Sequence, residues 1–221
     1  MEHFKSLKEY HAVGEASTQY FYTAKTPKKI YEFNPDFKLI FIIRNPVVRA
    51  YSNYNREIQV WGESRSFEEI IDRYTGPSMY YTHLSRFLKF FPKAQMRIII
   101  LEKFIKNVDR YLKEICEFLE INPKFKFNPN KFTRNPSKMP ISLRLQKLNK
   151  NFFYLNRREH FLLQAIRVGC RGVIDSINHL FYKSREFPKI KKSMKKNLKN
   201  YFHDEILKLE ELIEEDLSVW K

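Results

Sequence analysis

One short apolar run constrains the fold of this chain more than any other feature of its sequence. Lys38-Leu-Ile-Phe-Ile-Ile43 is rich in β-branched residues and stops abruptly at Arg44-Asn45-Pro46. A continuous run of this kind is typical of a strand that is buried on both faces of a parallel sheet. Asn45 is a good N-cap and Pro46 suits a first helical turn, so the pattern predicts a helix from here to about Val60.

The same order of elements repeats downstream. Apolar residues at helical spacing predict a helix over Tyr80–Phe91, which Pro92 ends, and Met96–Leu101 is a second buried apolar run. A further helix is predicted from about Lys103 to Glu120, and a last one near Phe202–Glu215 with its apolar residues on one face. Strands that alternate with helices predict an α/β fold, a parallel sheet flanked by helices, in a single domain over residues 1–221.

Composition argues against several other classes of protein and site. Cys116 and Cys170 are too few for a disulfide scaffold, and neither they nor the six histidines have metal-ligand spacing, so we expect no metal site. Cys116 instead falls on the apolar side of its predicted helix. No stretch approaches the roughly 18 to 20 apolar residues needed to cross a bilayer, and the first eight residues lack the core of a signal peptide. We therefore expect a cytoplasmic protein without membrane contact.

The positive charge of the chain is concentrated in one segment. Residues 122–198 contain 19 Lys and Arg against 3 Asp and Glu. A basic segment suits an anionic ligand such as a nucleotide, an acidic glycan or a nucleic acid, and a solvated lysine-rich surface explains the charge equally well. Aromatic residues interleave with the charges, so a basic nucleic-acid-binding module is one alternative function, although the motifs described below make it the less favoured one.

The first strand-to-helix junction is where we expect the chemistry of this chain. The turn that leaves the carboxyl end of a parallel strand is where α/β folds bind ligands, and a helix N-terminus favours phosphate. Arg44 stands at that turn and Ser52 follows eight residues later, so a guanidinium and a hydroxyl could hold one phosphate from two sides. By spacing alone, a capped turn with a surface arginine explains the same residues.

The junction also resembles a known motif. Ile43–Tyr54, Ile-Arg-Asn-Pro-Val-Val-Arg-Ala-Tyr-Ser-Asn-Tyr, is similar to the 3′-phosphate-binding motif of sulfotransferases that use 3′-phosphoadenosine 5′-phosphosulfate (PAPS), in which an arginine and a serine eight residues later bind the donor. Three more segments resemble parts of this family. Val13–Phe21 is similar to its Glu-Lys-Ser/Thr segment, Tyr80–Leu88 to a helix of the glucosamine N-sulfotransferases, and Leu209–Trp220 to its Leu-rich C-terminal helix that ends in Asp-Leu-Ser-x-Trp. The resemblance covers nearly the whole chain.

The resemblance implies a fold and an activity. The fold is a P-loop NTPase-like parallel sheet flanked by helices. The activity is transfer of a sulfuryl group from PAPS, an anionic nucleotide donor, to a hydroxyl or amine of a glycan or small-molecule acceptor. By the same resemblance, Arg44 and Ser52 bind the 3′-phosphate.

The resemblance also implies further site residues, each with an alternative. The loop Thr133–Pro140 resembles a basic loop that folds over the nucleotide, which makes candidate donor contacts of Arg134, Ser137 and Lys138; a solvated loop is the other interpretation. His83 matches a histidine near the acceptor, where an imidazole can share a proton, or it is a helix-surface histidine. Glu15 orients a substrate or water, or makes a structural hydrogen bond.

The chain also departs from the family pattern. None of its five glycines belongs to the Lys-x-Gly-Thr-like loop that holds the 5′-phosphosulfate, and the catalytic glutamate of the family would lie upstream of Met1 or at its edge. Ala16 stands where heparan-type members carry a lysine. We therefore expect a sheet without its N-terminal phosphate-loop strand, and little or no transfer by these 221 residues. A non-catalytic paralogue is the remaining alternative.

Overall fold

The structure is a computed structural model that describes residues 12–124, 187 and 189–220. It divides into two compact units, each built from segments that are far apart in the sequence. The first unit comprises Met1–Pro46, Gly76–Phe132 and Leu198–Lys221, and the second comprises Val47–Thr75 and Thr133–Asn197.

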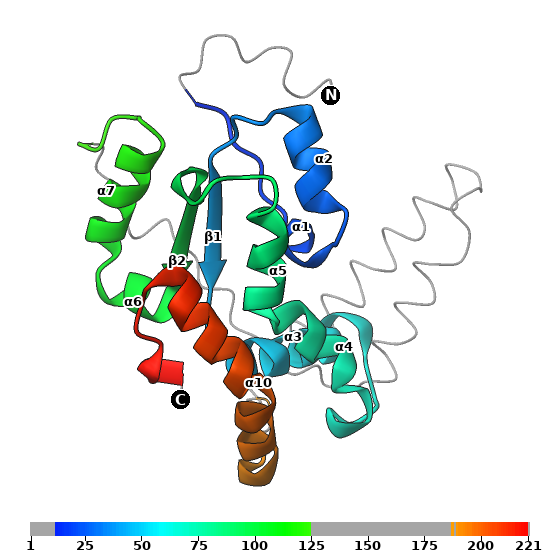
Figure 1. The fold of residues 1–221 in the computed structure, drawn as a ribbon. Helices are drawn as coiled ribbons and strands as arrows, with labels where there is room; N and C mark the ends of the chain where they lie inside the picture. The colour runs from blue at the N-terminus through cyan, green and yellow to red at the C-terminus, as the bar shows by residue number, and fades with distance from the viewer. Residues whose placement is uncertain (1–11, 125–186, 188, 221) are drawn as a thin grey trace, which may run out of the picture. The chain divides into compact units, whose positions relative to one another are not determined.

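A parallel pair of strands forms the centre of the first unit. β1 (Leu39–Ile43) and β2 (Met96–Ile100) pair in register, with Leu39 opposite Met96 (Figure 1). Both strands were predicted from their apolar runs, and their parallel pairing confirms the α/β interpretation. Successive side chains along a strand point to opposite faces of the sheet, so Phe41 and Ile43 share one face and Ile40 and Ile42 share the other. Paired residues of the two strands point to the same face.

Helices cover the first of these faces. Phe41 and Ile43 are buried there, and the ring of Phe41 lies 4.9 Å from that of Phe87 on α5 (Tyr80–Phe87). Phe21, on the short helix α1 (Thr18–Tyr22), packs against the same two rings at 5.5 and 6.4 Å. Aromatic contacts between an N-terminal helix, a strand and a helix from the middle of the chain therefore hold this side of the unit together.

The opposite face of the sheet is only half covered. On β2, Ile99 is buried and the Arg97 guanidinium donates to Glu114 on α7 (Val108–Phe118). On β1, Ile40 and Ile42 are 37% and 56% exposed. The prediction that β1 is buried on both faces is therefore wrong. An apolar run indicates that a strand prefers to be buried, but whether a helix covers each of its faces depends on the rest of the fold.

Two predicted helices differ from the helices in the structure. α5 ends at Phe87 instead of Phe91, and the N–H groups of Phe90 and Phe91 both donate to the carbonyl of Phe87 at 2.9 Å. The last turn of the helix is therefore tighter than an α-helical turn. It lies just before Pro92, whose ring disfavours helical backbone in the residue that precedes it.

The helix predicted from about Lys103 to Glu120 is two helices, α6 (Leu101–Lys106) and α7. The break lies at Asn107, whose φ of −149° and ψ of 64° are not helical. Asparagine forms helices poorly because its side chain competes for nearby backbone groups. Cys116 is buried on α7, as predicted.

The C-terminal helix is longer than predicted. α10 spans Lys192–Ile213, and its residues Leu198, Phe202, Ile206 and Leu209 are buried. Within the first unit, Glu205 on α10 accepts hydrogen bonds from the backbone N–H and the hydroxyl of Thr82 on α5. The predicted apolar face of this helix is thus confirmed for the two positions Ile206 and Leu209.

The other elements in the described ranges are short or connect the two strands to their helices. They are α2 (Thr26–Phe33), α3 (Pro46–Trp61), α4 (Asp72–Thr75) and the 3₁₀ turns η2 (Glu68–Ile70), η3 (Gly76–Ser78), η4 (Lys93–Gln95) and η6 (Ser218–Trp220). α3 begins at Pro46, as predicted from its place at a first turn. None of the helices in the described ranges is long and apolar enough to span a bilayer.

Aromatic rings form a cluster in the described part of the second unit. The ring of Phe67 lies 5.3 Å from those of Tyr51 and Tyr54 on α3, and 6.0 Å from that of Tyr74. Phe67 is 4% exposed and Tyr74 is 3% exposed. These contacts fix the loop that follows α3 against the helix.

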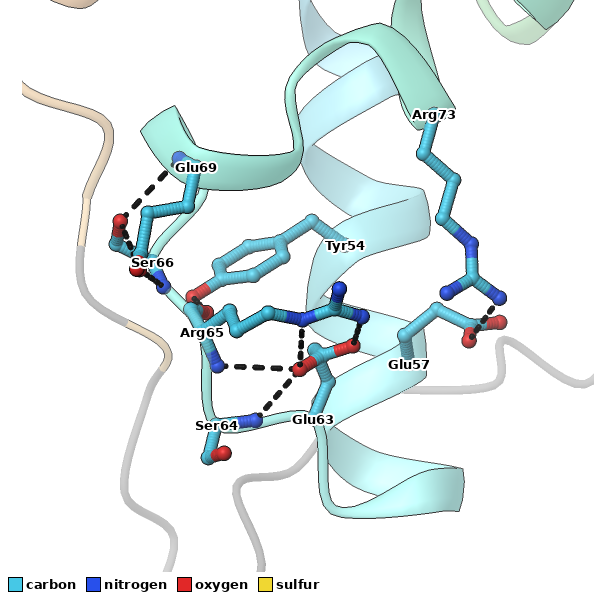
Figure 2. A network of polar contacts seen from close by, with 8 residues as sticks. All are labelled: Tyr54, Glu57, Glu63, Ser64, Arg65, Ser66, Glu69 and Arg73. Carbon is cyan, nitrogen blue, oxygen red and sulfur yellow. Dashed lines mark hydrogen bonds and ion pairs between the residues drawn. The ribbon is translucent and has the colours of Figure 1, made fainter.

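A polar network closes the same loop (Figure 2). Glu63 accepts hydrogen bonds from the Arg65 guanidinium at 2.6 and 3.1 Å and from the backbone N–H groups of Ser64 and Arg65 at 2.9 and 3.1 Å. The Tyr54 hydroxyl donates to the Arg65 carbonyl at 2.9 Å. Hydrogen bonds from the Arg65 side chain outweigh the opposing effect of burial, and together with the two backbone N–H groups they lower the pKa of Glu63 to about 2.

The lowered pKa predicts an acid-dependent contribution of Glu63 to stability. A depressed carboxylate pKa stabilises the folded state above the unfolded value of 4.5, and that contribution is lost as the pH falls towards about 2. In urea unfolding at several pH values, Glu63→Gln should therefore be clearly less stable than the wild type above pH 4.5, and the difference should narrow towards pH 2.

The matched control is Glu32→Gln. Glu32 has a 59% exposed side chain and one ion pair, with Lys28 at 3.5 Å, so we expect little change in stability at any pH. A stability difference for Glu63→Gln that stays constant between pH 6 and pH 3 would contradict the role given to its hydrogen bonds.

Candidate functional site

Arg44 occupies the turn at the carboxyl end of β1, where ligands bind in α/β folds. Its side chain is partly buried, and it makes no hydrogen bond or ion pair with any other residue that the structure describes. α3 begins two residues later at Pro46, and the N-terminus of a helix carries a positive partial charge. A guanidinium that is partly removed from water and has no acidic partner among these residues favours an anion as its ligand.

Glu102 holds the backbone of this turn in place. Its Oε1 accepts a hydrogen bond from the backbone N–H of Asn45 at 2.8 Å, and its Oε2 accepts one from the indole Nε1 of Trp220 at 3.1 Å. The Asn45 side chain completes the link, since its Nδ2 donates to the Trp220 carbonyl at 3.4 Å. The turn beside Arg44, the start of α6 and the C-terminal 3₁₀ turn are therefore joined through one carboxylate.

Sequence reasoning missed this group. Glu102 follows the second apolar run as Asn45 follows the first, and the carboxyl ends of paired parallel strands lie at the same edge of a sheet. The sequence therefore contained one indication that Glu102 lies near Asn45: both residues follow the carboxyl ends of strands predicted to be parallel. The contribution of Trp220 had no comparable signal, because it lies 118 residues away in the sequence.

We expect Glu102→Gln to lower the free energy of unfolding by about 1 to 3 kcal/mol, the range for leaving a buried donor without its acceptor. Glutamine keeps one carbonyl oxygen but turns an NH₂ group towards the other of the two N–H donors. Urea unfolding measures the loss.

Glu117→Gln is the control for this change. Among the described residues, the side chain of Glu117 forms only an exposed ion pair, with Lys113 at 3.8 Å, so we expect Glu117→Gln to lower the free energy of unfolding by no more than about 1 kcal/mol. Equal losses for the two variants would show that Glu102 does not hold the turn.

Ser52 lies on α3 in the second unit, eight residues after Arg44 in the chain. The helix has 3.6 residues per turn, so Ser52 lies within about two turns of Pro46. Its side chain is partly buried, and its hydroxyl makes no hydrogen bond with the other described residues. Like Arg44, Ser52 is a partly buried polar residue without a hydrogen-bond partner among the residues that the structure describes.

His83 is buried within the first unit and is held from both sides of its ring. It is 6% exposed; Nε2 lies 2.9 Å from the Gly76 carbonyl, and Nδ1 lies 3.3 Å from the Arg86 guanidinium. A carbonyl accepts and a guanidinium donates, so this pattern assigns the proton to Nε2 and a neutral ring. The ring of Phe21 packs edge-on against it at 5.3 Å.

Glu15 lies on the exposed segment that leads into α1. It accepts a hydrogen bond from the hydroxyl of Tyr20 at 3.2 Å. The negative charge of Glu15 is the main reason that the pKa of Tyr20 is raised. α1 packs against α5, which carries His83, so both sequence-predicted acceptor residues belong to the same group of elements in the first unit (Figure 1).

The remaining predicted site residues lie outside the described residues. These are Arg134, Ser137 and Lys138, together with Cys170. Within the described ranges, no group of three or more His, Cys, Asp and Glu side chains is placed to hold a metal ion.

Comparisons with known proteins identify relatives of this chain. Heparan sulfate glucosamine 3-O-sulfotransferase 5 of Mus musculus is 32% identical over 127 residues, which is 50% of this chain and 36% of that protein. Heparan sulfate glucosamine 3-O-sulfotransferase 6 of Homo sapiens is 28% identical over 133 residues, 53% of this chain and 39% of that protein. The chain thus spans less than half the length of these relatives.

A solved structure shares the fold. The sulfotransferase from Alicyclobacillus acidocaldarius superposes with a TM-score of 0.64 at 22% identity, over 95% of this chain and 67% of that one. The sequence also matches the Sulfotransferase domain family over residues 15–220. This match includes the β1–α3 turn, both sheet strands and the C-terminal 3₁₀ turn, and it shows that the chain belongs to the sulfotransferase domain family.

Proposed function

We propose that this chain binds PAPS and acts in the transfer of its sulfuryl group to a hydroxyl or amine of a glycan or small-molecule acceptor. The observation that carries the proposal is Arg44, a partly buried guanidinium without an acidic partner among the described residues, at the carboxyl end of β1. Membership of the sulfotransferase domain family supports the choice of donor. The names of the relatives support a glycan as acceptor.

The 3′-phosphate of the donor is the group that this chain is best equipped to hold. Arg44 supplies a planar cation suited to phosphate oxygens, and the Ser52 hydroxyl supplies a neutral donor eight residues later. Glu102 contributes indirectly, because it fixes the backbone beside Arg44. We assign Arg134, Ser137 and Lys138 to further donor contacts on the basis of their sequence resemblance.

PAPS would supply the sulfuryl group and leave as adenosine 3′,5′-bisphosphate when its bridging S–O bond breaks, and the acceptor hydroxyl or amine must lose a proton as the new S–O or S–N bond forms. We propose Glu15 and His83 for the acceptor side. The neutral ring of His83 has an accepting Nδ1 that now receives a hydrogen bond from Arg86, so it takes up a proton only when Arg86 withdraws. Glu15 is exposed and needs no such rearrangement to bind an acceptor hydroxyl.

Thermal unfolding with nucleotides tests the proposal. A ligand that binds only the folded chain stabilises it, by about 2.7 kcal/mol at a concentration 100 times its Kd. Adenosine 3′,5′-bisphosphate should raise the melting temperature, and an oligonucleotide at the same phosphate concentration should not do so at physiological salt. Stabilisation by the oligonucleotide alone, with a steep loss in salt, would favour a nucleic-acid-binding protein instead.

A further inference from the structure

The C-terminal segment Glu214–Trp220 is anchored by contacts of its own within the first unit. Lys103 on α6 forms an ion pair with Glu215 at 2.5 Å. The side chain of Trp220 is 1% exposed, and its ring lies 6.0 Å from that of Tyr80 on α5. A partly exposed ion pair contributes little by itself, so the buried ring supplies most of this anchoring.

Trp220 is also connected to the β1–α3 turn through Glu102 (Figure 1). The indole Nε1 donates to Oε2 of Glu102 at 3.1 Å, and Oε1 accepts the backbone N–H of Asn45 at 2.8 Å. The Trp220 carbonyl accepts a further hydrogen bond from the Asn45 side chain at 3.4 Å. A carboxylate only accepts hydrogen bonds, and here each oxygen has a donor, so the orientation of this carboxylate is fixed from two sides.

The hydrogen bond to Asn45 restrains the backbone of Arg44. The N–H of Asn45 and the carbonyl of Arg44 belong to the same peptide group, which is planar, so a bond to this N–H limits rotation on the carboxyl side of Arg44. α3 begins only at Pro46, and this N–H therefore lies outside the hydrogen-bond ladder of the helix. The Arg44 side chain makes no hydrogen bond or ion pair with another described residue. The direction of its guanidinium thus depends on the backbone that Glu102 holds.

We propose that Trp220 and Glu102 are positioning residues for the nucleotide. Through the N–H of Asn45 they hold Arg44 in the orientation in which its guanidinium meets the 3′-phosphate. A guanidinium that is in place before binding loses less conformational freedom when the phosphate arrives, so the affinity is higher. Coupling is reciprocal, and a bound nucleotide should also stabilise the contact between the C-terminal segment and the turn. This role rests on the proposed function and extends it to the C-terminal segment.

A double-mutant cycle separates positioning from a purely structural role. Glu102→Gln and Trp220→Phe, which removes the indole N–H but keeps an aromatic ring, should each weaken the binding of adenosine 3′,5′-bisphosphate about fivefold, the lower end of the usual range for coupling. Neither should change the affinity for adenosine 5′-monophosphate. When Arg44 is already replaced by alanine, Glu102→Gln should have no further effect on bisphosphate affinity, because Glu102 acts through Arg44.

Phe91→Leu is the control for a general loss of stability. Phe91 is 0% exposed, and its ring lies 5.6 Å from that of Tyr31 on α2, so the substitution destabilises the first unit. Phe91 precedes the amino end of β2, at the edge of the sheet opposite to Arg44. We expect this variant to be less stable than the wild type and to keep its bisphosphate affinity within about twofold.

Isothermal titration calorimetry on the full chain, below the unfolding temperature of every variant, measures these affinities. Equal losses of bisphosphate affinity for Glu102→Gln and Phe91→Leu would overturn the positioning role, since reduced stability would explain both. So would a further loss for Glu102→Gln in the Arg44→Ala background, or an equal loss for the two nucleotides. If the wild type does not bind the bisphosphate, the proposed function fails and the positioning role fails with it. If Arg44→Ala weakens the bisphosphate but Glu102→Gln does not, the proposed function stands and only the positioning role is wrong.

Discussion

Replacing Trp220 by alanine is expected to lower the free energy of unfolding by about 3 to 5 kcal/mol, the range for removing a large buried aromatic side chain. The side chain is 1% exposed, and its ring lies 6.0 Å from that of Tyr80 on α5. The substitution also removes the indole N–H that donates to Glu102 at 3.1 Å. Single domains have only about 5 to 15 kcal/mol of net stability, so this one change should remove a large part of it.

Two further variants separate the causes of that loss. Trp220→Phe keeps most of the buried ring and removes the indole hydrogen bond, so we expect a smaller loss, of about 1 to 3 kcal/mol. Val219→Ala alters a neighbour that is 49% exposed and should change stability by less than about 0.5 kcal/mol. Urea unfolding measures all three. A loss below 1 kcal/mol for Trp220→Ala would show that the C-terminal turn does not pack as described.

Arg44→Ala is expected to weaken the binding of adenosine 3′,5′-bisphosphate by about 1.5 to 3 kcal/mol, the range for a hydrogen bond to a charged group. This corresponds to about a 10- to 150-fold rise in Kd. Because Arg44 makes no hydrogen bond or ion pair with another described residue, its removal should leave stability almost unchanged. Adenosine 5′-monophosphate lacks the 3′-phosphate, so its affinity should not change.

The control for this variant is Arg56→Ala. Arg56 is an exposed arginine on α3, and its loss removes the same net charge. We expect it to change the affinity for either nucleotide less than twofold. If both arginine variants weaken the bisphosphate equally, attraction by overall charge explains the binding, and Arg44 has no specific role.

The two strands and the turn between β1 and α3 could be predicted because local sequence determines them. The apolar runs are uninterrupted, and Pro46 fixes a backbone torsion that suits the first turn of a helix. The break at Asn107 was harder to foresee. Asparagine has only a modest helix propensity, and the surrounding structure often overrides such a preference, so the sequence alone does not decide whether a helix breaks there.

The parts that sequence reasoning missed depend on contacts between distant segments. Ile40 and Ile42 belong to the same apolar run as Phe41, yet they are exposed, because burial depends on which helix lies over each face. Likewise, the position of Arg44 followed from spacing, but the carboxylate of Glu102 that holds its turn is 57 residues away from Asn45. The basic segment that contains Lys192 and Lys195 is visible in the sequence, but the pocket that these lysines share with Tyr51 of α3 depends on the fold.

Calorimetric titration of the wild-type chain with adenosine 3′,5′-bisphosphate and with adenosine 5′-monophosphate tests the central claim most directly. The claim is that the β1–α3 segment, through Arg44 and Ser52, binds the 3′-phosphate of a PAPS-type nucleotide. It predicts that the bisphosphate binds about 10- to 150-fold more tightly than the monophosphate, since only the bisphosphate offers these residues a charged partner. Equal affinities for the two nucleotides, or no binding of the bisphosphate, would contradict it.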